Sequence, residues 1–303
     1  MNSNDNKGIY LALTAAIISG FSIFLNKFAV AAVKQPLVFT AVRNTIVGIF
    51  ILTILLALKK WKDVKKLRIK EVRYLLLIGI IGGSLPFYLF FTGLSQIPAV
   101  NAAIIQKTLI IWVAILAIPF LKEKMSKMQI LGVITLFVGN LVVGGFKGFS
   151  FSKGEFFVLL ATILWGVENV IAKKALKNID ADLVTAARMG IGSLILLVVA
   201  AATSPVALVG ALSFTSKQWF WIVLSSTLLL GYVMTWYRAL QKAPATLVTS
   251  ILVVSTLITN LLSAVFVTRS VSGFLTPQTF MMVAGATLLI YSSGRKEALV
   301  LRV

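Results

Sequence analysis

Apolar runs of helix length follow one another along almost the whole chain, and they constrain the fold more than any motif. A helix needs about 20 apolar residues to cross the hydrocarbon core of a bilayer, and these runs have that length. Only short polar stretches separate them. Because 59% of the 303 residues are apolar, the chain carries more hydrophobic surface than one soluble core of this size buries. The sequence therefore predicts a polytopic membrane protein.

Ten such runs can be counted, and their pattern favours helices. A transmembrane barrel would alternate apolar and polar residues, and the sequence has no such alternation. We expect an all-α polytopic membrane protein with ten transmembrane helices. The first run is interpreted as a retained helix, because it continues to the full length of a span without a cleavage-like site. The runs are 8–31, 37–58, 74–95, 99–120, 127–145, 154–176, 183–203, 218–240, 246–268 and 277–293.

The chain has no cysteine and no histidine. This excludes disulfides, Cys/His metal sites and catalysis by Ser-His-Asp or Cys-His groups. No close pair of acidic residues falls inside the runs, and no nucleotide-binding loop is present. We therefore expect no enzyme, no catalytic residue, no metal site and no cofactor.

The net charge of +20 is explained better by membrane topology than by nucleic-acid binding. With the N-terminus inside, 20 of the 29 basic residues fall on the inner side and 6 on the outer side, and three lie within spans. Because basic residues concentrate in cytoplasmic loops, we expect both termini in the cytoplasm and no nucleic-acid partner. The densest basic segment, 59–73, is interpreted as a topology determinant, with binding of anionic lipid head groups as the alternative.

The two halves of the chain repeat at an offset of 146 residues. Residues 1–146 and 147–303 are therefore predicted to form two five-helix repeats. Because five is odd, the second copy enters the membrane from the opposite side, so we expect the repeats to be inverted. The matching segments are Lys7-Gly8 with Lys153-Gly154, Lys27 with Lys173, LSQIPA at 94–99 with LQKAPA at 240–245, and, after a slip of one residue, TAVR at 40–43 with TAAR at 185–188.

With these features the sequence resembles the EamA-type branch of the drug/metabolite transporter superfamily. The resemblance covers essentially the whole chain and implies ten helices in two repeats and export or exchange of small metabolites such as amino acids. Two positions depart from the family pattern: Arg269 replaces an acidic residue, and Gln106-Lys107 stands where an apolar or prolyl residue is expected. The residues that carry the resemblance are Arg43 and Arg188, the two Leu-x-x-x-Pro-Ala segments, Glu123 followed by Gly132 and Gly139, and Ala161, Trp165-Gly166, Lys173 and Ala175.

Glu168 is an ionisable residue well inside the run 156–176. Trp165 and Asn169 lie on neighbouring ridges of the same helix face. An ionisable group at this depth marks a functional site by default, because its burial is costly without a partner or a water-filled cavity. The other interpretation is an internal ion pair with Arg188, which we place at about the same depth.

Three cations also fall inside predicted spans. For Arg43 and Arg188, snorkelling or capping of backbone carbonyls competes with contact to a substrate. For Lys107, beside Gln106, a cavity-lining role competes with snorkelling toward lipid head groups. We expect no carboxylate near Arg43 or Lys107.

Polar and aromatic residues of the eighth and ninth runs complete the candidate site. Tyr232, Trp236 and Tyr237 are expected in a cavity wall together with Phe87, Phe90 and Phe91, although each alone can be an ordinary apolar or interfacial residue. Asn260 belongs to a polar stripe with Thr249, Thr256 and Ser263, a pattern that in membranes joins helices or contacts a ligand.

These observations predict a secondary transporter in a prokaryotic cytoplasmic (inner) membrane that moves an amino acid or other carboxylate-bearing metabolite by alternating access. Its expected partners are a small-molecule substrate and the lipid bilayer, and a monomer is sufficient for the cavity. Import or antiport of a phosphorylated or nucleotide-linked solute is the alternative, and an intramembrane enzyme or a membrane scaffold is the alternative of another class. We expect Lys107→Met and Glu168→Gln proteins to reach the membrane but to lose transport.

Overall fold

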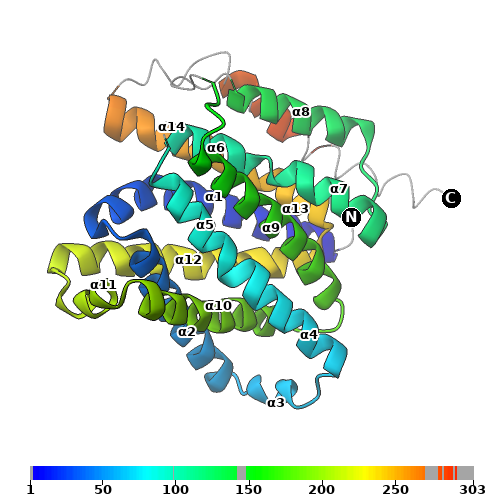
Figure 1. Cartoon of the computed structure of the whole chain (residues 1–303). Helices are drawn as coiled ribbons and strands as arrows, with labels where there is room; N and C mark the ends of the chain where they lie inside the picture. Colours follow the sequence, from blue (N-terminus) through cyan, green and yellow to red (C-terminus); the bar gives the residue numbers. More distant parts are fainter. Residues whose placement is uncertain are drawn as a thin grey trace.

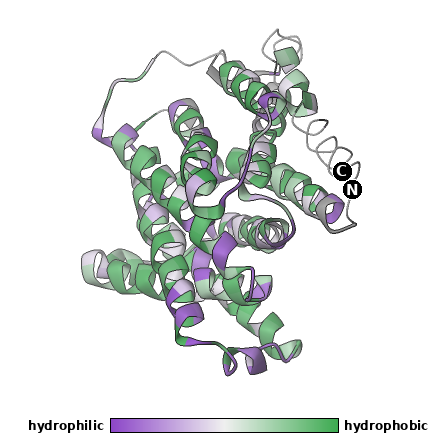
Figure 2. Cartoon of the chain, turned by 90° about the vertical axis from the view of Figure 1, so that its right-hand side faces the viewer, coloured by the Kyte–Doolittle hydropathy of each residue, from purple (hydrophilic) through white to green (hydrophobic). Residues whose placement is uncertain are grey.

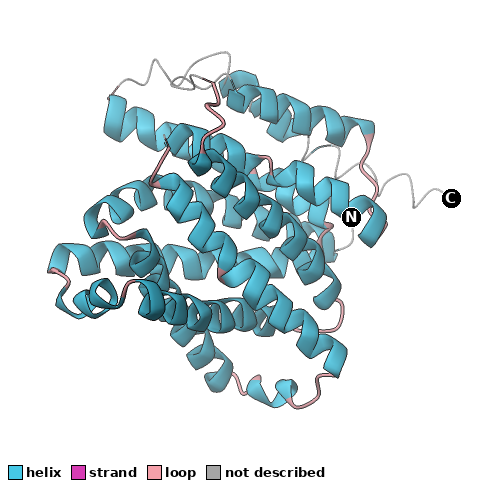
Figure 3. Cartoon of the chain, viewed as in Figure 1, coloured by secondary structure: helices cyan, strands magenta, loops and turns pink. Residues whose placement is uncertain are grey.

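The computed structural model describes residues 3–97, 99–141, 148–269, 279–281, 283–288 and 291, and every regular element among them is a helix (Figure 3). Pro98, of the first Leu-x-x-x-Pro-Ala segment, lies outside the described residues. In chain order the elements are α1 (Ser3–Val33), α2 (Pro36–Ala57), α3 (Trp61–Val64), α4 (Ile69–Leu77), η1 (Ile78–Gly82), α5 (Leu85–Leu94), α6 (Ala99–Lys107), α7 (Leu109–Leu121), α8 (Lys127–Leu141), α9 (Lys153–Ala175), α10 (Ala181–Thr203), α11 (Pro205–Gly210), η2 (Ala211–Ser213), α12 (Ser216–Lys242), α13 (Ala245–Leu252), α14 (Ser255–Ser263) and η3 (Ala264–Thr268).

Among the described residues, seven helical segments are long and apolar enough to cross a membrane, and they correspond to seven of the predicted runs. Three further apolar helices, Lys127–Gly139, Ala245–Thr259 and Thr279–Leu288, are shorter. The all-helical class is thus confirmed for the described residues, while the count of ten spans stays a prediction. The seven segments are Asn6–Val33, Pro36–Ala57, Ile69–Leu94, Ile104–Leu121, Lys153–Ala175, Ala181–Thr203 and Ser216–Lys242.

The outer surface of the bundle is apolar, as a lipid-facing surface must be. Leu56 on α2 is 62% exposed, and Leu194 and Val198 on α10 are 64% and 68% exposed. Figure 2 shows hydrophobic colouring along the helices and hydrophilic colouring mainly at helix ends and connections. Contact with lipid tails accounts for the exposure of these apolar side chains.

Two helix pairs, α1 with α12 and α5 with α9, form the frame around the centre of the molecule (Figure 1). Each pair has a close contact at a glycine in the first turns of one helix. A Cβ atom on Gly8 would lie 2.8 Å from Cβ of Ala243, and one on Gly154 would lie 2.6 Å from Cγ2 of Ile97. We call the end of the bundle that holds Gly8 and Ala243 the amino-terminal end, and the end that holds Gly154 and Ile97 the opposite end.

The helices α2 and α10 cross between these pairs and carry Arg43 and Arg188. The segment between η1 and α5 packs tightly on α10. A Cβ atom on Gly83 would collide with the carbonyl oxygen of Arg188, so only glycine permits this approach. Arg188 is thereby held at a fixed height in the bundle.

Three of the expected continuous helices are interrupted near the middle of the bundle. The predicted run 74–95 starts earlier, at Ile69, and contains the π-helix η1 before α5. A second expected helix is broken into α6 and α7 at Thr108, and a third is broken into α13 and α14 between Leu252 and Ser255. Backbone groups freed by such breaks need partners in a membrane, and the indole Nε1 of Trp165 donates a hydrogen bond to the Gly82 carbonyl oxygen at 3.2 Å.

Charged side chains tie the amino-terminal end together. The Glu123 carboxylate accepts hydrogen bonds from the backbone N–H groups of Ala245 and Thr246 at 2.7 and 2.9 Å, which caps α13. Asp182 accepts hydrogen bonds from Lys60 at 2.6 Å and from Arg238 at 2.8 Å. The Pro-Ala segment therefore marks a helix start that Glu123, in the connection between α7 and α8, caps.

Candidate functional site

A cavity of about 350 Å³ lies at the centre of the bundle, between the two helix pairs. Its lining extends from Asn169 and Trp236 at mid-depth to Lys27 and Ile97 at the opposite end. The cavity thus runs toward the opposite end and stops short of the amino-terminal end. Eight of the predicted site residues line it: Arg43, Gln106, Lys107, Trp165, Asn169, Arg188, Tyr232 and Trp236.

Arg188 sits in a buried cluster with a negative partner. The Glu168 carboxylate lies 3.8 Å from its Nη1 atom, and the Tyr237 hydroxyl bridges the two groups. The Tyr237 hydroxyl donates to Glu168 Oε1 at 2.5 Å and accepts from Arg188 Nη1 at 3.0 Å. Glu168 is fully buried, and a Cβ atom on Gly82 would collide with its side chain, so the acid fits only against a glycine. The positive charge of Arg188 is therefore balanced within the protein.

Arg43 sits in an otherwise similar cluster that has no acid. Its guanidinium group donates to the Asn44 side-chain oxygen at 3.1 and 3.2 Å. Its Cζ atom lies 5.0 Å from the centre of the Phe91 ring and 5.3 Å from that of Phe39. The side chain is only 2% exposed, and it faces the cavity. Within the described residues no carboxylate pairs with Arg43, as the sequence predicted.

The Phe87 ring connects the two clusters. It lies 5.4 Å from Cζ of Arg43 and 5.6 Å from Cζ of Arg188. Two guanidinium groups thus flank one ring, while the carboxylate of Glu168 is paired with Arg188 alone. Because a cation is attracted to a ring face but is not neutralised by it, the wall near Arg43 keeps an excess of positive charge.

Lys107 faces the same cavity and not lipid. Its side chain is buried, and Nζ donates a hydrogen bond to Oγ of Ser255 at 2.7 Å. Ser255 begins α14, and Lys107 ends α6, so this bond joins the two interrupted helices. The interpretation of Lys107 as a lipid-snorkelling residue is wrong here, because the helix break turns it into the bundle.

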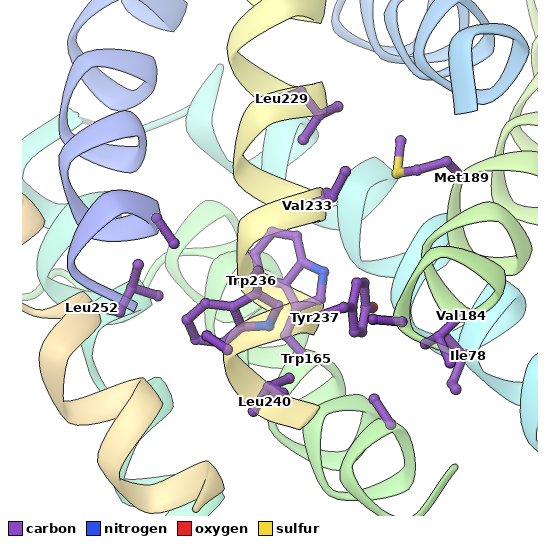
Figure 4. Close-up of a cluster of buried hydrophobic side chains, with 14 of the residues drawn as sticks. Ile78, Trp165, Val184, Met189, Leu229, Val233, Trp236, Tyr237, Leu240 and Leu252 are labelled. Carbon is purple, nitrogen blue, oxygen red and sulfur yellow. The ribbon is translucent and has the colours of Figure 1, made fainter. Parts of the chain in front are cut away.

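Aromatic side chains form the wall nearest the amino-terminal end. The Trp236 indole donates a hydrogen bond to the Asn169 side-chain oxygen at 3.0 Å, and the Tyr232 ring stacks on Trp236 with centroids 5.6 Å apart. On the other side, Phe90 lies 5.4 Å from Trp165 between ring centroids. Figure 4 shows Trp236 and Tyr237 leaving α12 in the buried cluster, with Trp165 beside them. These rings close the cavity on that side.

Two predicted residues are not placed in the cavity wall. Glu168 lies behind it, in the cluster with Arg188 and Tyr237, so its carboxylate has no cavity contact. Asn260 belongs to α14, and its side chain lies outside the described residues. Of the polar stripe on this segment, Thr249 lines the cavity, and its hydroxyl donates to the Ala245 carbonyl oxygen at 2.8 Å.

Residues of α1 that sequence reasoning left out of the site also line the cavity: Ser19, Ser22, Asn26 and Lys27. Asn26 accepts a hydrogen bond from Ser225 of α12 at 2.6 Å. For Lys27, the match to Lys173 in the second half of the chain is the one sequence feature that could have identified it as a candidate. In the described part of the chain no group of three or more acidic side chains is arranged to hold a metal ion.

Comparison with known proteins identifies the class of this molecule. The model of the EamA-like transporter family matches twice, at residues 6–145 and 152–291. A Bacillus subtilis (strain 168) protein named "Uncharacterized transporter YyaM" is 30% identical over 223 residues, which are 68% of this chain and 72% of that protein. The B. subtilis "Uncharacterized transporter YvbV" is 26% identical over 273 residues, 87% of this chain and 83% of that protein.

A solved crystal structure matches the fold with a TM-score of 0.72 over 93% of this chain and 98% of its own, at 17% sequence identity. At this sequence identity, the similarity supports the fold and not the function. The family match, the relatives named as transporters and the seven membrane-length helices of the described residues make this a membrane protein of the transporter class. The chain belongs to the EamA-like transporter family.

Proposed function

We propose that the protein is a secondary transporter that moves a small carboxylate-bearing metabolite, such as an amino acid, across the cytoplasmic membrane. Residues 1–146 and 147–303 act as two inverted repeats that expose the central cavity to each side in turn. The amino-terminal end of the bundle faces the cytoplasm, because the loops there hold most of the basic residues. The cavity then opens to the outside in this conformation.

The choice of a carboxylate as cargo rests on one observation: among the described residues, no acid pairs with Arg43. Glu168 and Tyr237 are the polar partners of Arg188. At the offset of 146 residues their counterparts are Ser22 and Phe91, which line the same cavity as Arg43 but bring no charge. A carboxylate of the cargo takes at Arg43 the place that Glu168 takes at Arg188.

Further features of the cavity support an anion. Lys107 and Lys27 add further cations to the wall, and among the described residues the partner of Lys107 is the neutral Ser255. The interrupted helices at Thr108 and Ser255 are typical of transporter sites, because broken helices present free backbone groups to cargo. Gln106 and Asn169 supply neutral hydrogen-bonding groups for the rest of the molecule. Glu168 serves to hold Arg188 in place.

Cavity size favours a small metabolite over the nucleotide-linked solutes of the alternative. Sites for small molecules have volumes of about 300–1,000 Å³, and the cavity of about 350 Å³ lies at the low end of that range. A small phosphorylated solute would use the same cations, so the experiment must include one.

Counterflow in liposomes tests the proposal. The purified protein is reconstituted and preloaded in turn with unlabelled amino acids, dicarboxylates and a sugar phosphate, and entry of the labelled compound is followed. We expect exchange of a carboxylate that Arg43→Gln reduces and Arg43→Lys partly restores. Exchange of neutral or cationic compounds only, unaffected by Arg43→Gln, would overturn the proposal.

A further inference from the structure

Lys173 closes the amino-terminal end by capping a helix. Its Nζ atom donates hydrogen bonds to the carbonyl oxygens of Leu240 and Ala243, at 2.5 and 2.7 Å. These are among the last carbonyl groups of α12, where a lysine is favoured both by hydrogen bonding and by the helix dipole. The bond joins α9 to α12, which belong to different helix pairs.

The repeat offset of 146 residues maps all three partners onto a second set. Lys173 corresponds to Lys27, Leu240 to Leu94 and Ala243 to Ile97. The three residues of this second set all line the cavity at the opposite end. Lys27 is exposed, and no hydrogen bond to another described residue is found for it. The same three positions are thus joined at one end of the molecule and apart at the other.

The contacts within each helix pair do not differ in this way. Gly8 packs closely against Ala243 in the pair of α1 and α12, and Gly154 packs closely against Ile97 in the pair of α9 and α5. These two contacts are related by the same offset, and both are present. The helix pairs therefore keep their internal packing, and the difference between the two ends lies in the contacts between the pairs.

We propose that Lys27 is the closing residue of the opposite end. When the cavity closes there, the ammonium group of Lys27 donates to the carbonyl oxygens of Leu94 and Ile97 and joins α1 to α5. The bonds of Lys173 to Leu240 and Ala243 then break, and the cavity opens at the amino-terminal end. Each lysine thus caps a helix end in one conformation and releases it in the other. This inference rests on the proposed function only because it takes alternating access as the mechanism.

Distances between spin labels at each end test this without any cargo. The chain has no cysteine, so pairs of introduced cysteines can be labelled directly. Ala31→Cys with Gln96→Cys reports on the opposite end, and Lys177→Cys with Lys242→Cys reports on the amino-terminal end. The labelled full-length protein is measured in liposomes, with and without Lys27→Met in the background.

Two lysine variants should shift the populations in opposite directions. A hydrogen bond to a charged group contributes enough that Lys27→Met should reduce the population closed at the opposite end by about tenfold. Lys173→Met should reduce the population closed at the amino-terminal end by a similar factor. Lys27→Arg should behave like the wild type, and Lys7→Met, on α1 but at the amino-terminal end, should leave both distributions unchanged.

The proposal fails if Lys27→Met leaves the distance distributions unchanged, or if both lysine variants shift them the same way. Should Lys173→Met fold poorly, the Lys27 variants decide alone. Because the readout needs no cargo, a negative result here does not touch the assignment of Arg43. Conversely, if the counterflow experiment shows no exchange of anions, the lysine variants can still shift the distance distributions, and this inference would stand.

Discussion

Arg43 and Arg188 occupy corresponding positions in the two halves of the chain, but their partners differ. Both are buried arginines beside aromatic rings, and both flank Phe87. Arg188 has Glu168 within 3.8 Å, whereas the corresponding position near Arg43 is Ser22. If the proposed function holds, a repeated fold becomes a binding site where one copy leaves out an internal partner. The copy with the acid then shows how the other copy would bind an external carboxylate.

The largest expected effect comes from breaking the complete copy. Glu168→Gln leaves Arg188 buried without a counter-charge, and loss of one partner of a buried ion pair costs about 3–5 kcal/mol of unfolding free energy. Thermal unfolding in detergent should show a clearly lower midpoint. Asp63→Asn is the matched control, because the Asp63 side chain is 49% exposed in its pair with Lys66 and should change little. An unchanged midpoint for Glu168→Gln would contradict the role given to the acid.

Next in size is the loss of the unpaired arginine. Arg43→Gln removes a charged donor from the cavity, which corresponds to about 1.5–3 kcal/mol of binding, or roughly a 10- to 150-fold weaker affinity for a carboxylate. Binding of a labelled carboxylate to the reconstituted protein measures this. The same variant should unfold near the wild-type temperature, because Arg43 has no internal carboxylate to leave behind. A strongly lowered temperature would show that both arginines are structural.

How much the sequence predicts also differs between the two copies. Seven of the apolar runs are confirmed as membrane-length helices among the described residues, and the pair of Glu168 with Arg188, one of the two interpretations that depth allows, is present. The division into two repeats stays a prediction. The burial of Lys107 in the bundle does not follow from spacing and depth, since it depends on helix breaks at Thr108 and Ser255 that no proline or glycine at those positions announces. Tyr237, which bridges Glu168 and Arg188, reads in the sequence as one more aromatic residue.

Copying the acid into the incomplete copy should produce a smaller change. Ser22→Glu places a carboxylate at the position that corresponds to Glu168, where it competes with cargo for Arg43. We expect about tenfold weaker binding of a carboxylate, equal to about 1.4 kcal/mol. Ser22→Gln is the control of equal size and should bind as the wild type does within about twofold. Equal loss in both variants would point to crowding and not to charge.

The smallest expected change in stability concerns another acid of the second copy, Asp182, at the amino-terminal end. The corresponding residue of the first copy, at the offset of 146 residues, is Pro36. Lys60 donates to Asp182 at 2.6 Å and to Asp180 at 2.9 Å. Burial alone would lower the pKa of Lys60, but hydrogen bonds and charge from the two aspartates outweigh it and raise this pKa above its ordinary value.

Lys60→Ala should therefore cost only about 0.2–1 kcal/mol of unfolding free energy, the usual contribution of a partly exposed pair. A lysine whose pKa is raised on folding stabilises the fold fully below its ordinary pKa of 10.5, and this contribution disappears as the pH rises through the folded-state value. Unfolding midpoints of the wild type and Lys60→Ala should thus differ by a constant amount from pH 7 to about pH 9 and converge above about pH 10.5. A difference that grows with pH would mean that Asp180 and Asp182 do not stabilise the charged lysine.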